Sequence, residues 1–460
     1  MRPAGPPPKP AAMTKRLFRP AARRQGQKPA PAPGLAARRR ACELVEAVLL
    51  KRRPLDDVLD EPTDLDASDR ALVRKIAATT LRRLGTIDRL LEERLAKGLP
   101  DGLPRLRTVL RTGACQVLFL DLADYAAVDI AVRLVEADRK ARGFAGLTNA
   151  VLRGLARDRE LILGHLDPLD DLPAWLRARW IATYGEAQTR AIAAIQAVEP
   201  PLDLTVKADP QGWAHRLGGL AMPTGSVRLA GAGQVTALDG FGEGAWWVQD
   251  AAAALPARLL GEVAGRMVAD LCAAPGGKTA QLAAAGARVT AVDRSARRLE
   301  RLTANMERLG LTVTVATADA LDLTGTFDAV LLDAPCSATG TVRGHPDVMH
   351  LKTMADVEGL ARMQARLLDR LGELLAPGGK AVYCTCSLEP EEGERQIADL
   401  LARDGRMALD PIRPDEFAGL APFVTPEGFM RTLPSAWSHA EPTLAGLDGF
   451  FAARLVRKPD

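Results

Sequence analysis

Two cysteines follow strand-like hydrophobic runs at positions where thiol chemistry is possible. Cys336 lies in the motif Asp-Ala-Pro-Cys-Ser-Ala-Thr-Gly, which begins at Asp333, and Cys386 lies in Tyr-Cys-Thr-Cys-Ser. Two thiols in one pocket suit the alkylation of carbon 5 of a pyrimidine. A thiolate that adds to carbon 6 makes carbon 5 nucleophilic, and a second acid/base group must then help to release the product. A carboxylate near N3 of the base would stabilise the adduct, and Asp333 is the nearest candidate.

The position of the two thiols in the chain does not decide which one attacks. Both follow strands that lie close together in a doubly wound sheet, so both can reach one pocket. A lone cysteine is most often a small buried hydrophobe. We therefore assign Cys384 to the strand interior and Cys386 to the loop beyond the strand.

A second set of residues, further upstream, has the character of a nucleoside site. A strand-like run ends at Leu271 and is followed by a turn of small residues with two adjacent glycines, which lets the backbone approach a ligand closely. Acids follow the next three strand-like runs, and an acid in this place can bind both ribose hydroxyls. The pyrophosphate motifs of P-loop and dinucleotide enzymes are absent, which favours S-adenosylmethionine over NAD. The residues of this set are Cys272, Ala273, Ala274, Pro275, Gly276, Gly277, Lys278, Asp293, Asp319 and Asp333.

Alternating strand and helix signals after residue 246 predict the sheet that positions these residues. Near-continuous apolar strands separated by helices are typical of a mostly parallel sheet covered on both faces. Ligands bind beyond the carboxyl ends of such strands, where the strand order reverses. The expected strands are Met267–Leu271, Val289–Val292, Val313–Ala316, Ala329–Leu332 and Ala381–Cys384.

The remainder of the chain divides into three further parts. At about 150 residues per domain, 460 residues suggest roughly three domains. Residues 1–37 are rich in proline and basic side chains and predict a disordered tail. Residues 38–160 carry apolar stripes at helical spacing and predict an all-α bundle. Residues 161–245 predict linker helices and a small α+β domain, and residues 246–460 the α/β domain.

Composition excludes several classes of protein. No apolar stretch is long enough to cross a membrane, and the basic N-terminus lacks the hydrophobic segment of a signal peptide, so we expect a cytoplasmic protein. Six cysteines without a Cys-x-x-Cys pair give no support for a disulfide scaffold or a metal site. Residues 1–40 hold eleven Lys and Arg and no acid, a distribution that suits contact with a polyanion as well as a solubilising extension.

The motifs together resemble those of RNA cytosine-C5 methyltransferases of the RsmB/NOP/Sun family. The resemblance rests on "DLCAAPGGKT", "AVD", "LLDAPCSATG", "YCTCS" and the C-terminal "DGFFAARLVRK", and the helical part with "LTNAVLRGLAR" resembles a NusB-like RNA-binding domain. It implies a Rossmann-like methyltransferase domain, S-adenosylmethionine as cofactor, Cys386 as the nucleophile and Cys336 as the group that assists product release. It also implies that residues 272–278, Asp293, Asp319 and Asp333 line the cofactor site.

These interpretations lead to one expected function and two alternatives. We expect methyl transfer to carbon 5 of a cytosine in 16S ribosomal RNA through a covalent cysteine–carbon 6 adduct, by a protein that acts as a monomer. The same chemistry on transfer RNA is the first alternative, and a non-catalytic NusB-like RNA-binding factor is the second. DNA cytosine methyltransferases attack with a Pro-Cys thiol, which would make Cys336 the nucleophile instead.

Overall fold

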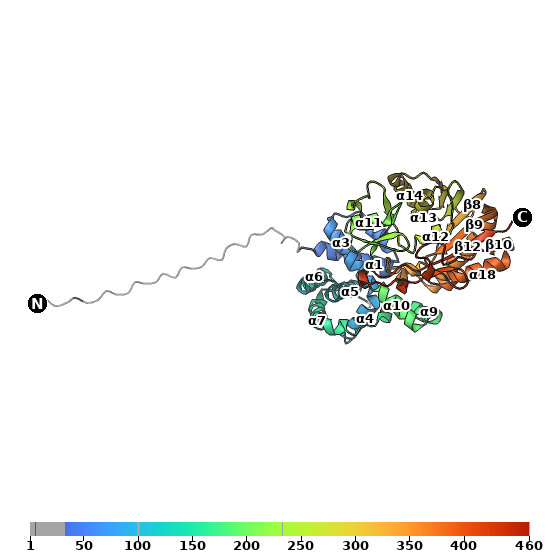
Figure 1. Cartoon of the computed structure of the whole chain (residues 1–460). Helices are drawn as coiled ribbons and strands as arrows, with labels where there is room; N and C mark the ends of the chain where they lie inside the picture. Colours follow the sequence, from blue (N-terminus) through green and yellow to red (C-terminus); the bar gives the residue numbers. More distant parts are fainter. Residues whose placement is uncertain (1–4, 6–32, 99–101, 232, 460) are drawn as a thin grey trace.

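The computed structural model describes residues 5, 33–98, 102–231 and 233–459 (Figure 1). The basic tail expected over residues 1–37 therefore lies almost wholly outside the described residues. The first helix begins at Leu35, three residues before the expected start of the bundle, because Ala37 already packs into its core. Within the described ranges, every helix is too short or too polar to span a bilayer.

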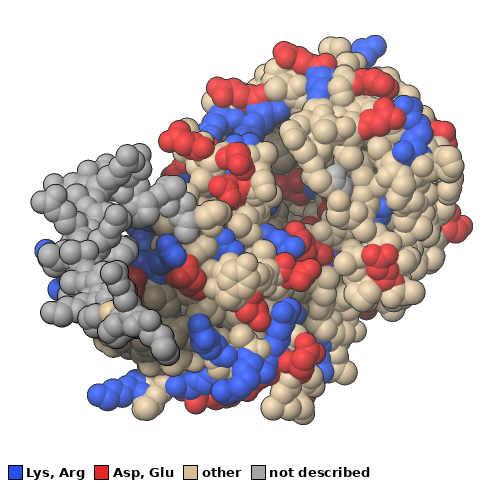
Figure 2. All heavy atoms as spheres, turned by 90° about the vertical axis from the view of Figure 1, so that its left-hand side faces the viewer, with Lys and Arg blue, Asp and Glu red and all other residues tan. Residues whose placement is uncertain are grey.

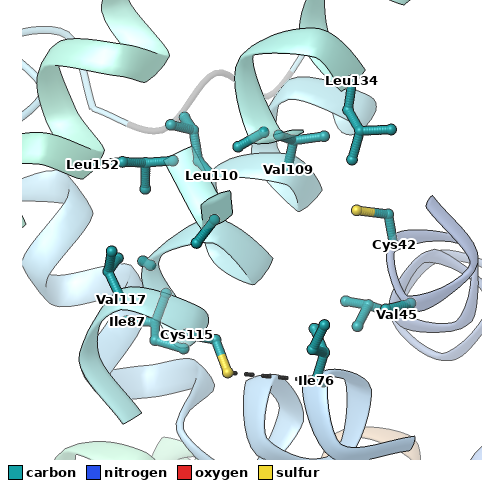
Figure 3. Packing of buried hydrophobic residues seen from close by; sticks show 14 of the residues in the cluster. Cys42, Val45, Ile76, Ile87, Val109, Leu110, Cys115, Val117, Leu134 and Leu152 are labelled. Atoms are coloured by element: carbon teal, nitrogen blue, oxygen red, sulfur yellow. Dashed lines mark hydrogen bonds between the residues drawn. The ribbon is translucent and has the colours of Figure 1, made fainter. Parts of the chain in front are cut away.

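The N-terminal part is an all-α bundle, as the apolar stripes predicted. Its central helix α5 begins with a proline, whose missing N–H is not needed at a helix start, and is buried along most of its length. Helices α1, α3, α6 and α7 pack around it, and Cys42 and Cys115 are buried in this core (Figure 3). The helices are α1 (Leu35–Lys51), α2 (Leu55–Leu59), α3 (Ala67–Arg82), α4 (Leu84–Glu92), α5 (Pro104–Phe119), α6 (Asp124–Ala137), α7 (Ala145–Arg157) and α8 (Arg159–Leu163).

Two helices and a small antiparallel sheet follow the bundle. The sheet has the order β2-β3-β1-β4, and buried Trp246 packs in its core. Strand β4 forms its ladder with β1, so the boundary expected at residue 246 falls inside this small sheet. The elements are α9 (Ala174–Tyr184), α10 (Glu186–Gln196), β1 (Leu202–Val206), α11 (Pro210–Leu217), β2 (Leu220–Ala221), β3 (Ser226–Leu229) and β4 (Trp246–Val248).

The C-terminal part is built on a mostly parallel, doubly wound sheet, which confirms the predicted fold class. Its order is β10-β12-β9-β8-β5-β6-β7, with β11 paired to β12, and the strands from β5 to β9 are parallel. The chain runs outward from β5 in one direction through β6 and β7 and then returns to β8, so the strand order reverses between β5 and β8. Apolar clusters cover both faces. The strands are β5 (Met267–Leu271), β6 (Arg288–Asp293), β7 (Thr314–Thr317), β8 (Phe327–Asp333), β9 (Leu375–Thr385), β10 (Met407–Leu409), β11 (Met430–Thr432) and β12 (Phe450–Arg457).

The helices of this domain lie between the strands in sequence, as a parallel sheet requires. Helix α14 presents an amphipathic face whose buried members include Leu299 and Leu302, and the Ser295 side chain caps its first turn. Helix α16 starts with a capping box between Thr353 and Asp356. The main helices are α12 (Leu255–Arg258), α13 (Gly277–Ala284), α14 (Ala296–Leu309), α16 (Met354–Asp369) and α18 (Glu394–Arg403).

Candidate active site

The two thiols meet where β8 and β9 end side by side. The register pairs Asp333 with Cys384, so both strands finish at the same level of the sheet. Cys336 follows in the loop after β8 and Cys386 directly after β9, and their Sγ atoms lie 3.4 Å apart. The hydrogen bond with Cys386, followed by burial, raises the pKa of Cys336 well above its ordinary value. Cys336 therefore retains its proton at neutral pH.

A buried carboxylate ties the two thiol loops together. Glu392 Oε1 accepts a hydrogen bond from the backbone N–H of Ser337 at 2.9 Å, and Glu392 Oε2 accepts one from Ser387 Oγ at 2.5 Å. Each serine is the residue after one of the two cysteines. Gln364 Nε2 donates a further bond to Oε1 at 3.0 Å. Burial raises the pKa of Glu392, and the bonds from the serines oppose that shift. This role was not predictable from the sequence, because Glu392 lies in an acidic stretch that is typical of a solvated surface.

Lys278 and Asp333 form an ion pair beside the thiols. The Nζ of Lys278 lies 2.7 Å from Asp333 Oδ2 and 5.0 Å from the centre of the Phe450 ring. Burial alone would lower the pKa of Lys278, but Asp333 and the nearby thiols Cys384 and Cys386 outweigh it and raise that pKa. Cys384 Sγ donates to the other oxygen, Asp333 Oδ1, at 3.4 Å. A fixed cation therefore lies next to the thiol pair.

One cavity of about 560 Å³ opens onto this group. Cys386, Asp333 and Lys278 line it, and Cys336 does not. The remaining wall combines aromatic surface with charge, a composition that suits a base attached to a sugar and a phosphate. Its other lining residues include Phe241, Trp247, Asp250, Arg301, Asn305, Arg308, His345, Asp448 and Phe450.

A second, narrower crevice lies at the ends of β5, β6 and β7. Asp293 is buried at its base, where Asp293 Oδ1 accepts from Ser295 N at 2.9 Å and Asp293 Oδ2 accepts from Ala274 N at 3.2 Å. The guanidinium of Arg298 lies 3.4 Å from Asp293 Oδ2, whereas Oδ1 accepts from Ser295 alone and can still accept from a ribose hydroxyl. Asp319, Arg294 and Arg298 line the same crevice. Its remaining lining residues are mostly apolar: Cys272, Val292, Ala318, Ala320, Pro335, Met363 and Leu367. Acids at one end and an apolar slot at the other suit an adenosine group.

The turn after β5 serves both hollows. Cys272 lines the crevice, whereas Ala273, Pro275, Gly277 and Lys278 line the larger cavity. Gly276 has φ +102°, and a Cβ on it would lie 2.7 Å from the Leu302 side chain, so only glycine fits there. We expected Asp333 to contact both the cofactor and the base, but among the two hollows it lines only the larger cavity.

Two further acids in the larger cavity were not among the residues that the sequence singled out. Asp448 N donates to Asp250 Oδ1 at 3.3 Å, and both side chains line the cavity. Burial, followed by repulsion from Asp203, raises the pKa of Asp250 to about 6. Burial, followed by the charge of Asp250, raises the pKa of Asp448 well above its ordinary value.

Comparison with known protein families agrees with this architecture. The family model described as 16S rRNA methyltransferase RsmB/F matches residues 257–456, and that of the NusB family matches residues 35–157. Ribosomal RNA small subunit methyltransferase B of Klebsiella pneumoniae is 32% identical over 442 residues, covering 91% of this chain and 97% of the relative. The protein of the same description from Xanthomonas campestris is 37% identical over 404 residues, covering 83% and 91%.

Solved structures share the fold. The crystal structure of the protein PH0851 has a TM-score of 0.70 at 24% identity and covers 93% of this chain and 100% of that chain. A methyltransferase homologue from Pyrococcus horikoshii has a TM-score of 0.50 at 28% identity and covers 61% and 94%. A helical NusB domain joined to a doubly wound sheet with this site defines an RNA methyltransferase. The chain belongs to the RsmB/F family of 16S ribosomal RNA methyltransferases.

Proposed function

We propose that this protein transfers a methyl group from S-adenosylmethionine to carbon 5 of a cytosine in 16S ribosomal RNA, through a covalent adduct between Cys386 and carbon 6. The observation that carries the proposal is the 3.4 Å separation of Cys336 Sγ and Cys386 Sγ at the ends of adjacent strands. One thiol alone would suffice for addition, but addition followed by elimination needs a second group at the same place.

The first half of the reaction is the attack on carbon 6. Cys386 is the thiol that lines the cavity, and the Lys278 ammonium is close enough to interact with it by charge. These two facts support Cys386 over Cys336 as the nucleophile. As the Sγ–carbon 6 bond forms, negative charge develops toward N3 and O2 of the ring, where the Lys278–Asp333 pair lies ready to donate a proton or a hydrogen bond.

The second half is the release of the methylated base. The proton on carbon 5 leaves to a base, the carbon 6–sulfur bond breaks, and the electron pair returns to Cys386 as thiolate. The Cys336 thiol is hydrogen-bonded to that sulfur in the free protein and stabilises the departing thiolate. Glu392 holds both loops, so the two sulfurs keep this separation through the cycle.

S-adenosylmethionine, when bound, supplies an electrophilic methyl group at its sulfonium. In this chain Asp293 and Asp319 would hold the ribose, and the apolar side chains of the crevice would enclose the adenine. The turn after β5 lines both the crevice and the base cavity, which supports a donor on one side of the turn and a base on the other. The target base must be unpaired or flipped to enter.

The 16S ribosomal RNA target is supported by the family description and by the two named relatives. We further propose that the protein acts as a monomer in the cytoplasm. Transfer RNA remains the alternative substrate.

The experiment is to incubate the full chain with unmodified 16S and transfer RNA transcripts and S-adenosylmethionine, followed by bisulfite sequencing. A single protected cytosine in the 16S transcript, absent when Cys386 is changed to alanine, is the expected result. Methylation at nitrogen, or at no cytosine, would overturn the proposal.

A further inference from the structure

Helix α2 of the N-terminal bundle contacts two of the residues that line the base cavity. Asp56 lies in its first turn, and Asp56 Oδ2 is 3.1 Å from His345 Nδ1. Asp60, one turn further on and at the end of the helix, pairs with the guanidinium of Arg301. Arg301 and His345 both line the cavity that contains Cys386. The two acids are four residues apart and therefore share one face of α2.

The bundle holds the whole segment that carries His345. The backbone N–H of Leu55 donates to Asp347 Oδ2 at 2.9 Å, and Arg82 donates to the carbonyl of Arg343 at 2.9 Å. His350 Nε2 bonds the carbonyl of Leu81 at 2.8 Å. This segment continues from the loop of Cys336. The bundle therefore holds the segment that forms one wall of the cavity. This structural role is separate from any binding of RNA by the bundle itself.

The surroundings of His345 suit a cation with a free donor. The hydrogen bond to Asp56 raises the pKa of His345, and burial opposes this rise. The charge of Asp347 also raises the pKa, whereas the charge of Arg74 on α3 lowers it. Its side chain is 50% exposed, and among the described residues none bonds its Nε2. An imidazole that donates from Nδ1 to a carboxylate and from Nε2 to a second anion must carry both protons.

Arg301 of α14 offers a second set of donors in the same cavity. A guanidinium has five N–H groups, and the exposed pair with Asp60 occupies only part of them. Exposed ion pairs of this kind are weak, so an incoming phosphate can share the guanidinium or displace the carboxylate. On the face drawn in Figure 2, basic and acidic side chains lie close to one another.

We propose that His345 and Arg301 bind the RNA backbone phosphate beside the target nucleotide, with Asp56 as the positioning residue that holds the imidazolium. The inference rests on the proposed function and adds to it a subsite that couples the bundle to the catalytic cavity. The phosphate site is tested by a different measurement from the thiol chemistry, because it affects the affinity for RNA and not the methyl transfer itself.

The test measures affinity of the full chain for a 16S ribosomal RNA transcript, without methyl donor, over pH about 6 to 8.5 and over increasing salt. His345→Gln is expected to weaken binding roughly fivefold to thirtyfold at the acid end and to reduce the salt slope by about one phosphate contact. His345→Arg is expected to keep the affinity while losing its dependence on pH. Asp56→Asn should shift the fall in affinity to lower pH.

Asp57→Asn is the matched control for the loss of one negative charge, because Asp57 lies on the same helix and acts on Arg301 through its charge. Its affinity for RNA should change with pH in the same way as that of the wild type. Three results would each overturn the inference. The first is that His345→Gln keeps the affinity and salt slope of the wild type. The others are identical pH curves for the Asp56 and Asp57 variants, or a loss of affinity that His345→Arg does not restore. If these affinities behave as expected but bisulfite sequencing finds no methylcytosine, the cytosine chemistry fails and the phosphate site stands.

Discussion

Cys336 Sγ and Cys386 Sγ lie 3.4 Å apart although fifty residues separate them in the chain. The contact exists because β8 and β9 are parallel neighbours in register at Asp333 and Cys384, so the loops that follow them start at one level. A slip of one residue in that register would turn one thiol to the opposite face of the sheet. The reactive pair is thus a property of strand pairing as much as of the two loops.

The Lys278–Asp333 pair should control the rate of the chemical step. Asp333→Asn leaves a buried ammonium without its counter-charge, so the pKa of Lys278 falls and the stabilisation of the attacked ring is lost. We expect kcat to fall about 100-fold to 1000-fold with little change in affinity for S-adenosylmethionine. Radiolabelled methyl transfer measures it. Lys278→Met should lower kcat by a similar factor. The double variant should lower kcat by no more than either single change. Additive losses would mean that the two residues act separately.

Glu392 should matter for both folding and rate. Glu392→Gln removes an acceptor from a site where Ser337 and Ser387 donate, and each buried donor left unpaired costs roughly 1–3 kcal/mol. The melting temperature and kcat should both fall. Glu391→Gln is the control, because Glu391 bonds arginines near the surface, Arg179 and Arg395. Equal effects of the two substitutions would show that Glu392 does not hold the thiol loops.

Asp293 should determine affinity for the methyl donor. Asp293→Ala removes the acceptor expected for the ribose, and we predict that the Kd for S-adenosylmethionine rises about tenfold to a hundredfold. RNA affinity should not change. Isothermal titration measures the Kd for S-adenosylmethionine, and filter binding measures the affinity for RNA. Asp322→Ala, an exposed acid that lines neither hollow, should bind the donor like the wild type. A normal Kd in the Asp293 variant would move the donor out of this crevice.

Asp270 should make stability depend on pH. Burial raises its pKa from an ordinary value of 3.8 to about 7, although Thr279 Oγ1 donates to Asp270 Oδ2 at 2.6 Å. Because the folded-state pKa is the higher one, its contribution to stability is complete below about pH 4 and is lost as the pH rises through about 7. The urea midpoint of the wild type should therefore decline, relative to that of Asp270→Asn, between these values. Parallel curves would contradict this assignment.

Much of the fold was predictable because its signals are local. The apolar strand runs and the helical stripes of the bundle indicated the layers correctly, since each element must bury one face. The strand ends could also be located, which brought Asp293, Cys336 and Cys386 to one edge of the sheet. Strand β4 was assigned to the wrong side of a boundary because its partner, β1, lies forty residues away.

The contacts between distant segments were not predictable. Glu392 looks like any acid in a polar stretch, and its role arises only when two loops fold over it. His345 and His350 both contact the N-terminal bundle, through Asp56 and the carbonyl of Leu81. Nothing near either histidine in the sequence indicates a partner nearly three hundred residues away.

The trapping of protein–RNA adducts tests the division of labour between the thiols most directly. Full-length wild type, Cys336→Ala and Cys386→Ala are each incubated with 16S ribosomal RNA and S-adenosylmethionine and then run on a denaturing gel. The Cys336 variant should accumulate a covalent adduct that carries the new methyl group, because release is impaired, and the Cys386 variant should form neither adduct nor product. An adduct that accumulates in the Cys386 variant and is absent from the Cys336 variant would reverse the two roles and contradict the mechanism.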